Sequence, residues 1–252
     1  MTTARTPILG FGVQVADLEG AVSSILRRVQ DGGRGYAVLF NTHMCSEAHR
    51  DPALCAAVES AEWVFADGRP IYWLQRLRGA SGARQVRGAD LTWALLDAAR
   101  RSGTPVGFFG GSPHVLELLQ TKLASDLPGL DLRLALSPPH GGWSEEADRD
   151  YVGRITAAGV RILFVALGCP RQELWMMRHV GELGAVMLGI GAAVDFCAGV
   201  KPQAPRLLQR LGLEWLYRLA TEPRRLWRRY LFHNMHFLAL LAFRGRRNSS
   251  PR

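Results

Sequence analysis

Polar side chains that could act on a substrate follow the apolar runs of this chain where those runs end. Asp67 comes directly after the apolar run 63–66, and Asn41 comes directly after the run 36–40. A carboxyl group at the end of a buried strand is partly desolvated, which raises its pKa toward the range that suits a general base. The residue types alone also allow a plain turn at Asp67 and Gly68, and that alternative stays open here.

Glycines follow three further apolar runs. They are Gly110 with Gly111, Gly168, and Gly189 with Gly191. Because glycine has no side chain, its backbone can approach a phosphate or a sugar closely. A glycine at a strand end is equally typical of an ordinary turn, and the sequence has no complete G-x-G-x-x-G motif at these positions. We expect these glycines to face one pocket, since the carboxyl ends of parallel strands share one edge of a sheet.

Acidic residues at two further places bear on metal and ligand binding. Asp148 and Asp150 form a D-x-D pattern, which can hold a metal ion against a nucleotide diphosphate. The pattern falls inside an amphipathic helix that opens at Glu145, where solvated acidic residues favour the helix dipole. Asp195 is more typical of a structural carboxylate, with a place in the donor pocket as its functional alternative. We therefore predict no metal ion and no other cofactor for the reaction.

The positions of these side chains depend on a regular alternation of strands and helices. Apolar runs predict strands at 36–41, 63–67, 106–110, 130–136, 161–167 and 185–190. Amphipathic stretches predict helices at 47–61, 91–101, 114–125, 145–158 and 171–181. Such alternation is typical of an α/β fold in which helices cover both faces of a mostly parallel sheet. Ligands then bind beyond the carboxyl ends of the strands.

The chain changes character after residue 199, where the pattern predicts only helices, at 205–219 and 223–243. Residues 201–252 hold twelve of the 31 Lys and Arg residues but two of the 22 Asp and Glu residues. Basic residues interleaved with Leu, Trp, Tyr and Phe favour an anionic partner with an apolar side, such as a membrane surface or a lipid phosphate. We divide the chain into a core at 1–199, a basic helical, membrane-associating appendage at 200–244 and a disordered tail at 245–252.

Without a metal ion, arginines of the appendage could stabilise a departing diphosphate, because guanidinium pairs with phosphate oxygens in a bidentate way. The candidates are Arg218, Arg225 and Arg228. A basic helix that faces solvent or lipid explains the same residues equally well.

Other features indicate the cellular compartment. The N-terminus lacks a basic stretch followed by an apolar core and a cleavage site, so we expect no secretory signal. No apolar run approaches the roughly 20 residues that a membrane span requires. Four scattered cysteines without a C-x-x-C pair argue against a disulfide framework or a cysteine zinc site, and they fit a reducing cytoplasm.

Two other function classes are alternatives. A Rossmann-like, nicotinamide-dependent oxidoreductase would need a glycine fingerprint after its first strand, and the residues around Asn41 do not form one. The net charge of +9 suggests a non-catalytic protein that binds nucleic acid or a membrane. Because the charge lies in an apolar-rich helical segment, we expect lipid rather than nucleic acid as the partner.

The ordered motifs of residues 8–243 resemble those of the WecG/TagA/CpsF family of bacterial glycosyltransferases. The motifs are NTHMCSEAH at 41–49, FADGRP at 65–70, GADL at 88–91, FGG at 109–111, LGCPRQELW at 167–175, GIGAAVDFCAG at 189–199, AP at 204–205, LEWLYRL at 213–219 and EPRR at 222–225. The resemblance implies a Rossmann-like core and an inverting, metal-independent enzyme.

Such an enzyme moves a hexose, such as N-acetylmannosamine, its uronic acid or a related sugar, from a UDP-sugar to a polyprenyl-diphosphate-linked sugar. The resemblance places it on the inner face of the bacterial cell membrane, as a peripheral protein that binds anionic lipid. Its products would enter teichoic-acid linkage units, enterobacterial common antigen, capsule or exopolysaccharide. A homo-oligomer that completes the active site stays open.

Position by position, the resemblance implies that Asp67 is the catalytic base and that Asn41 and Gln172 position sugar hydroxyls. The appendage arginines of the family match Arg218, Arg225 and Arg228, and the strand-end glycines with Asp195 would form the donor pocket. Two positions depart from the family pattern: Leu39 replaces a frequent Thr, and Gln85 replaces a frequent Arg, for which Arg84 or Arg87 could substitute. These departures concern the identity of the donor sugar.

Overall fold

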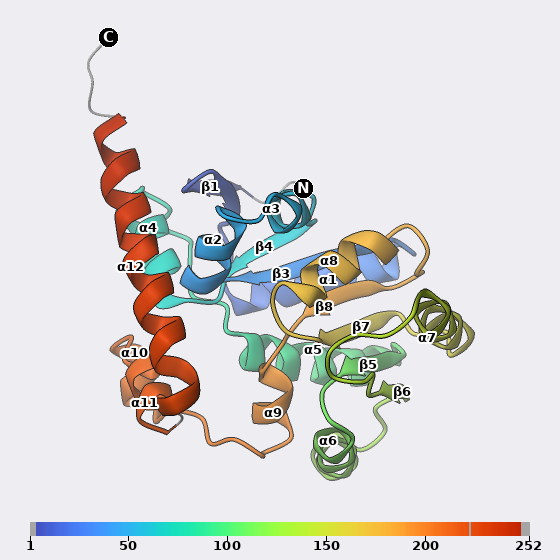
Figure 1. Ribbon diagram of the computed structural model, residues 1–252. Helices are drawn as coiled ribbons and strands as arrows, with labels where there is room; N and C mark the ends of the chain where they lie inside the picture. Colours follow the sequence, from blue (N-terminus) through green and yellow to red (C-terminus); the bar gives the residue numbers. More distant parts are fainter. Residues whose placement is uncertain (1–3, 222, 248–252) are drawn as a thin grey trace.

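The computed structural model describes residues 4–221 and 223–247 (Figure 1). Its centre is a sheet of six parallel strands in the order β4-β3-β8-β7-β5-β6. The strands are β3 (Gly35–Phe40), β4 (Trp63–Ala66), β5 (Val106–Gly110), β6 (Leu132–Leu136), β7 (Ile162–Ala166) and β8 (Val186–Gly189). The predicted α/β fold with a mostly parallel sheet is therefore confirmed.

Apolar layers cover both faces of this sheet. In β3, Ala37 and Leu39 join one layer, whereas Tyr36, Val38 and Phe40 join the other, because successive side chains of a strand point to opposite faces. The first layer lies under α1 (Leu18–Gln30), α5 (Gly88–Ser102), α6 (Pro113–Asp126) and α9 (Ala193–Cys197). The second lies under α2 (Thr42–Ala48), α3 (Pro52–Glu59), α7 (Glu145–Ala157) and α8 (Arg171–His179). Burial on both faces explains why the strands are continuous apolar runs.

Several elements differ from the sequence prediction. The hairpin β1 (Arg5–Ile8) and β2 (Phe11–Gln14), α1 and α4 (Arg69–Leu77) were not predicted. The predicted helix 47–61 is wrong as one unit, because it is divided between α2 and α3. Asp51 caps α3 by accepting from the backbone N–H of Ala53 at 2.9 Å, and Pro52 fits the first helical turn, where its missing N–H is not needed.

The C-terminal part consists of α10 (Arg206–Arg210), α11 (Glu214–Thr221) and α12 (Pro223–Arg247). The predicted helix 205–219 is wrong as one unit, because Gly212 has a φ of +74° that ends α10. A Cβ atom at Gly212 would lie 2.8 Å from the Trp73 ring, so this turn packs directly on α4. α12 continues beyond the predicted end at 243, and residues 248–252 of the predicted tail lie outside the described residues.

α12 runs along one flank of the molecule, beside α2 (Figure 1). Phe237 is buried in the apolar layer of α2, and the Thr42 hydroxyl donates to the Asn234 side-chain oxygen at 3.0 Å. Ser46 Oγ lies 2.8 Å from Nδ1 of His236. These contacts attach the helix to the core through the middle of its length. Among the described residues, no helix combines the length and the apolarity that a bilayer span requires.

Candidate active site

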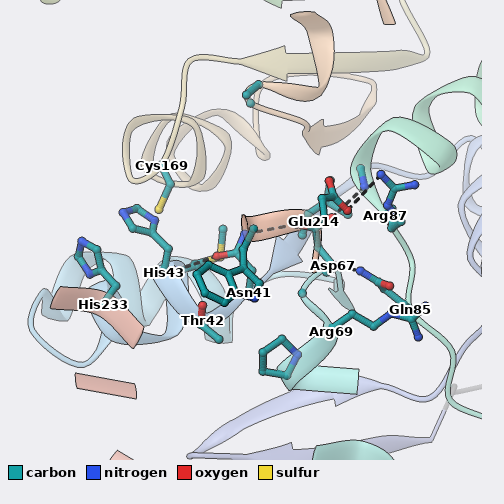
Figure 2. A pocket seen from close by; sticks show the side chains of 18 of the residues that line it. Asn41, Thr42, His43, Asp67, Arg69, Gln85, Arg87, Cys169, Glu214 and His233 are labelled. Carbon is teal, nitrogen blue, oxygen red and sulfur yellow. Dashed lines mark hydrogen bonds and ion pairs between the residues drawn. The ribbon is translucent and has the colours of Figure 1, made fainter. Parts of the chain in front are cut away.

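A cavity of about 760 Å³ lies at the carboxyl ends of β3, β4 and β8 and is bounded on its other side by the C-terminal helices (Figure 2). Asn41 follows β3, Asp67 follows β4 and Gly189 ends β8, and all three line the cavity. The helical wall comes from α4, α11 and α12 and includes Trp73, Glu214, Trp215, Arg218, His233 and Phe237. The cavity thus forms where the fold class predicts a ligand site.

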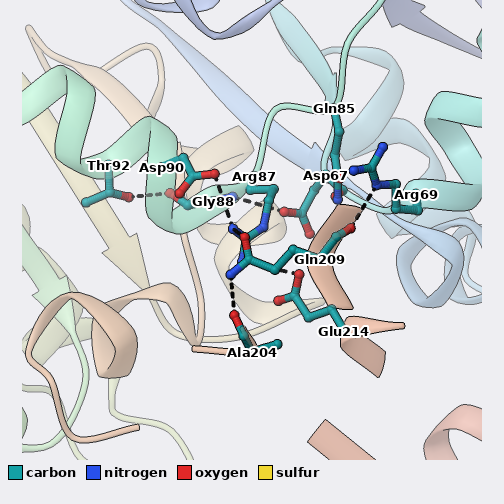
Figure 3. Close-up of polar contacts among 10 residues, drawn as sticks. All are labelled: Asp67, Arg69, Gln85, Arg87, Gly88, Asp90, Thr92, Ala204, Gln209 and Glu214. Carbon is teal, nitrogen blue, oxygen red and sulfur yellow. Dashed lines mark hydrogen bonds and ion pairs between the residues drawn. The ribbon is translucent and has the colours of Figure 1, made fainter. Parts of the chain in front are cut away.

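Asp67 lies at the centre of a small hydrogen-bond network (Figures 2 and 3). Its Oδ1 accepts from the backbone N–H of Gly88 at 3.0 Å, and its Oδ2 accepts from Nδ2 of Asn41 at 3.3 Å. Nε2 of Gln85 donates to the backbone carbonyl of Asp67 at 2.6 Å. The carboxylate is therefore fixed in orientation at the cavity wall.

Gly88 can make this contact because it opens α5 and has no side chain. The first N–H groups of a helix lack partners within the helix, so the one at Gly88 is free to donate to a carboxylate. A Cβ atom at this position would lie 2.9 Å from Cδ1 of Leu39 and 3.4 Å from Cβ of Ala193. The glycine thus allows α5 to approach β3 closely enough to reach Asp67.

Burial raises the pKa of the Asp67 carboxyl above its ordinary value, because desolvation disfavours the charged form. The Gly88 N–H opposes this effect, whereas the negative charge of Glu214 adds to it. The Asn41 amide and the positive charge of Arg87 also lower the pKa, by smaller amounts. The net result is a carboxylate that binds a proton more readily than a solvated aspartate does.

Asn41 forms hydrogen bonds both to Asp67 and to the backbone. Its Oδ1 accepts from the backbone N–H of Met44 at 3.1 Å and so caps α2. This bond fixes the direction of the amide, whose nitrogen then faces Asp67. The sequence predicted that Asn41 positions a sugar hydroxyl, and the structure adds a direct bond to the predicted base.

Gln172 lines the same cavity and is held on both sides. Its Oε1 accepts from the backbone N–H of Gly168 at 3.2 Å, and its Nε2 donates to Oε1 of Glu173 at 2.7 Å. A Cβ atom at Gly189 would lie 2.9 Å from that Nε2, and a Cβ atom at Gly191 would lie 3.4 Å from Oε1 of Gln172. The structure thus gathers three of the predicted glycines around Gln172.

Burial raises the pKa of the neighbouring Glu173 carboxyl to about 7.

Gly110, Gly111 and Asp195 are not among the residues that line this cavity. This cavity therefore gathers only part of the glycine-bearing strand ends that we expected to face one pocket. The reason is strand order: β7 and β8 lie between β5, which ends in Gly110, and β3. A Cβ atom at Gly110 would lie 2.5 Å from the Ala166 backbone, so this glycine serves close packing. Asp195 pairs with Lys201 at 2.7 Å.

The C-terminal segment docks beside Asp67 through residues that sequence reasoning did not connect (Figure 3). Arg87 pairs with Glu214 at 3.2 Å and donates to Oε1 of Gln209 at 2.5 Å. Nε of Arg69 donates to the backbone carbonyl of Gln209 at 3.1 Å. Arg69 lies in the FADGRP motif and Glu214 in the LEWLYRL motif. Their place in these motifs was the one sign in the sequence that they belong to the site.

The sequence model of the glycosyl transferase WecG/TagA/CpsF family matches residues 6–251, nearly the whole chain. The chain belongs to this family. As a glycosyltransferase, it has a sugar donor and a sugar acceptor. The match supports the resemblance of its motifs over the oxidoreductase and nucleic-acid-binding alternatives.

The predicted arginines of this glycosyltransferase are described to different extents. Arg218 lines the cavity, and its guanidinium lies 5.2 Å from the centre of the Phe196 ring. Its Nε atom is buried, and no described residue accepts a hydrogen bond from it. Arg225 and Arg228 lie on α12, with side chains outside the described part of the chain.

The D-x-D pattern of the glycosyltransferase does not present two carboxylates to one point. Asp148 is buried and accepts from the indole N–H groups of Trp143 at 2.8 Å and Trp175 at 2.9 Å. Its other oxygen lies 2.9 Å from Nε2 of His179. Asp150 is exposed. The expectation of a solvated carboxylate is wrong for Asp148, because Trp143 just before α7 and Trp175 and His179 of α8 enclose it.

Proposed function

We propose that this glycosyltransferase is an inverting, metal-independent enzyme of cell-surface polysaccharide synthesis. It moves a hexose from a UDP-sugar to a polyprenyl-diphosphate-linked acceptor at the inner face of the bacterial membrane. The observation that carries the proposal is the Asp67 carboxylate, held in the cavity wall by Gly88 and Asn41.

Asp67 acts as the general base in this reaction. It takes the proton of the acceptor hydroxyl while the hydroxyl oxygen bonds to the anomeric carbon of the donor sugar. The bond from that carbon to the UDP oxygen breaks, its electron pair leaves with UDP, and attack from the opposite face inverts the configuration. The raised pKa of Asp67 suits this role, because a stronger base removes the proton more readily.

The leaving diphosphate needs positive charge as its own negative charge develops. The position of Arg218 at the cavity supports such a role, because a guanidinium pairs with diphosphate oxygens in a bidentate way. Arg225 and Arg228 are assigned the same role from their match to the family motif. A cation held in a low-dielectric site stabilises a developing anion more strongly than it would in water.

Sugar hydroxyls are positioned by Asn41 and Gln172. Gln172 is presented to the cavity in a fixed orientation by Gly168 and Glu173, and rigid hydrogen-bonding groups favour one sugar pose over others. Leu39 and Gln85, where the family pattern differs, both line the cavity beside Asp67. These two side chains therefore bear on the choice of donor sugar.

Membrane attachment is assigned to the C-terminal helices. α12 exposes large apolar side chains, and it belongs to the part of the chain where positive charge is concentrated. The exposed residues are Trp227, Phe232, Met235, Leu238 and Phe243. A helix of this composition binds an anionic bilayer surface through apolar burial together with electrostatic attraction. The lipid-linked acceptor would then meet the cavity at its helical wall.

The experiment that tests this function offers a panel of UDP-sugars with short-chain polyprenyl-diphosphate-linked acceptors, and reads the products by mass. We expect one added hexose unit, release of UDP and an inverted anomeric centre, with activity retained in a metal chelator. Transfer with retained configuration, or transfer that requires an added divalent ion, would contradict the mechanism. Co-sedimentation with anionic and neutral vesicles tests the attachment.

A further inference from the structure

Three side chains of the kinds that bind metal ions meet where α12 packs on α2. They are His43 and Glu47 of α2 and His233 of α12, and their ligand atoms all lie within 4.8 Å of one another. His43 and Glu47 are four residues apart, so they share one face of their helix. Figure 2 shows the two histidine side chains beside each other at the cavity wall.

The distances within this cluster fit a small metal ion. Nδ1 of His233 lies 3.4 Å from Oε1 of Glu47, and the two histidine rings are 4.3 Å apart at an angle of 75°. Tetrahedral Zn²⁺ with nitrogen or oxygen ligands at about 2.0–2.1 Å separates those ligands by about 3.3 Å. The cluster therefore needs only small side-chain movements to enclose an ion.

The chemistry of the three ligands indicates which ion. Two imidazoles and one carboxylate form a known Zn²⁺ ligand set, with a fourth position left for water, and Fe²⁺ also binds such a set. Ser46 Oγ also lies 3.2 Å from Nδ1 of His233, so an ion bound to that nitrogen would replace the Ser46 contact.

We propose that His43, Glu47 and His233 bind a Zn²⁺ ion that fastens α12 to α2 at the wall of the cavity. The ion would take no part in the transfer step, and the proposal does not depend on the proposed function. Sequence reasoning considered only cysteine and D-x-D patterns for metals, whereas these ligands come from distant segments of the chain.

A histidine–glutamate ion pair without metal is the competing explanation, and metal titration of the full chain separates the two. The protein is prepared without a polyhistidine tag, freed of metal with EDTA, kept reduced, and titrated with ZnCl₂ by calorimetry. We expect one Zn²⁺ per chain, with an affinity at least tenfold weaker in Glu47→Gln and His233→Gln. The matched control is His114→Gln, which changes an exposed histidine on α6 and should bind as the parent does.

A second measurement reports on the fastening itself. At a Zn²⁺ concentration about 100 times Kd, the melting temperature should rise by about 5–10 °C in the parent and in the control. Zn²⁺ should also slow protease cleavage within α12 in these two proteins, but not in His233→Gln. Should His233→Gln fail to fold, Glu47→Gln decides, because it keeps the shape of the side chain.

The proposal is overturned if the parent binds no Zn²⁺, or if both cluster variants bind it as tightly as the control. Because Cys169 also lines the cavity, Cys169→Ser is titrated in parallel. Binding that is lost in Cys169→Ser and kept in both cluster variants would assign the ion to the thiol and would likewise overturn the proposal.

Discussion

Replacing Asp67 with Asn tests the proposed base with little change of shape. In the variant, the side-chain oxygen can still accept from the Gly88 N–H, which lies 3.0 Å away in the parent. The new amide nitrogen would face Nδ2 of Asn41, so the 3.3 Å bond between these side chains is lost. One such bond contributes about 1 kcal/mol to stability, and removing a buried charge offsets part of that loss.

The effect on the reaction should be much larger than the effect on stability. A positioned general base contributes about 100- to 10,000-fold to a rate. At about 1.36 kcal/mol for each tenfold step, this corresponds to roughly 3–5 kcal/mol of transition-state stabilisation. The variant should therefore fold normally, bind the UDP-sugar normally, and turn over at least about 100-fold more slowly.

The assay measures kcat/KM for the lipid-linked acceptor from pH 4 to 9, together with donor affinity by competition. The parent should lose activity as pH falls through the raised pKa of Asp67, because protonation removes the base. Asp67→Asn should lack this acidic limb. Asp150→Asn, which changes an exposed carboxylate on α7, is the matched control. Turnover within about tenfold of the parent, or an unchanged acidic limb in Asp67→Asn, would refute the reasoning.

Three further variants test the surroundings of the site. Glu173→Gln tests linkage: a carboxyl whose pKa rises from 4.5 to about 7 contributes stability below about pH 4.5, and this is lost as pH rises through 7. The unfolding free energy of the parent minus that of Glu173→Gln should therefore fall by about 3 kcal/mol between pH 4 and pH 8, measured in urea. Arg87→Gln removes the ion pair with Glu214 and should speed proteolysis between residues 201 and 221. Gly88→Ala places a methyl 2.9 Å from Leu39 and should lower stability by about 1–3 kcal/mol.

Each of these variants has its own comparison. A flat difference between the parent and Glu173→Gln across the pH range would show that folding does not raise the pKa of this carboxyl. Arg100→Gln, which breaks an ion pair within α5 alone, should leave proteolysis of the C-terminal segment unchanged. In a double-mutant cycle, Gly88→Ala should cost less stability when Leu39 is already Ala. If it does not, the contact with Leu39 is not the cause.

Local sequence patterns predicted the part of the site that depends on neighbouring strands. Asn41 and Asp67 follow apolar runs that are consecutive strands of the parallel sheet, and these strands pair directly as β3 and β4. The alternation of strands and helices therefore predicted that the Asn41 and Asp67 side chains lie close together. Gly110 lies outside this cavity because the order of strands depends on long-range packing, which a local apolar run does not encode.

The rest of the site depends on contacts between segments far apart in the chain. Arg87 pairs with Glu214 of α11, and the turn at Gly212 just before α11 packs against Trp73 of α4. Residues 69–77 were not predicted as a helix, since Gly68 and Pro70 also favour a turn. Asp148 was expected to be solvated because the sequence does not show that the indole of Trp175 reaches it from a different helix. Periodicity describes one segment at a time and contains no information on such pairs.

Two consecutive residues, Arg87 and Gly88, connect the C-terminal helices to the chemistry. While α11 is docked, Glu214 neutralises Arg87 and adds negative potential at Asp67, which increases the proton affinity of that carboxylate. Departure of α11 would remove the Glu214 anion and leave Arg87 paired with Asp90 alone, so both changes would make Asp67 a weaker base. Basicity is thereby greatest in the closed protein. Under the proposed mechanism, an open enzyme holding a UDP-sugar would be less able to activate water, which would protect the donor from hydrolysis.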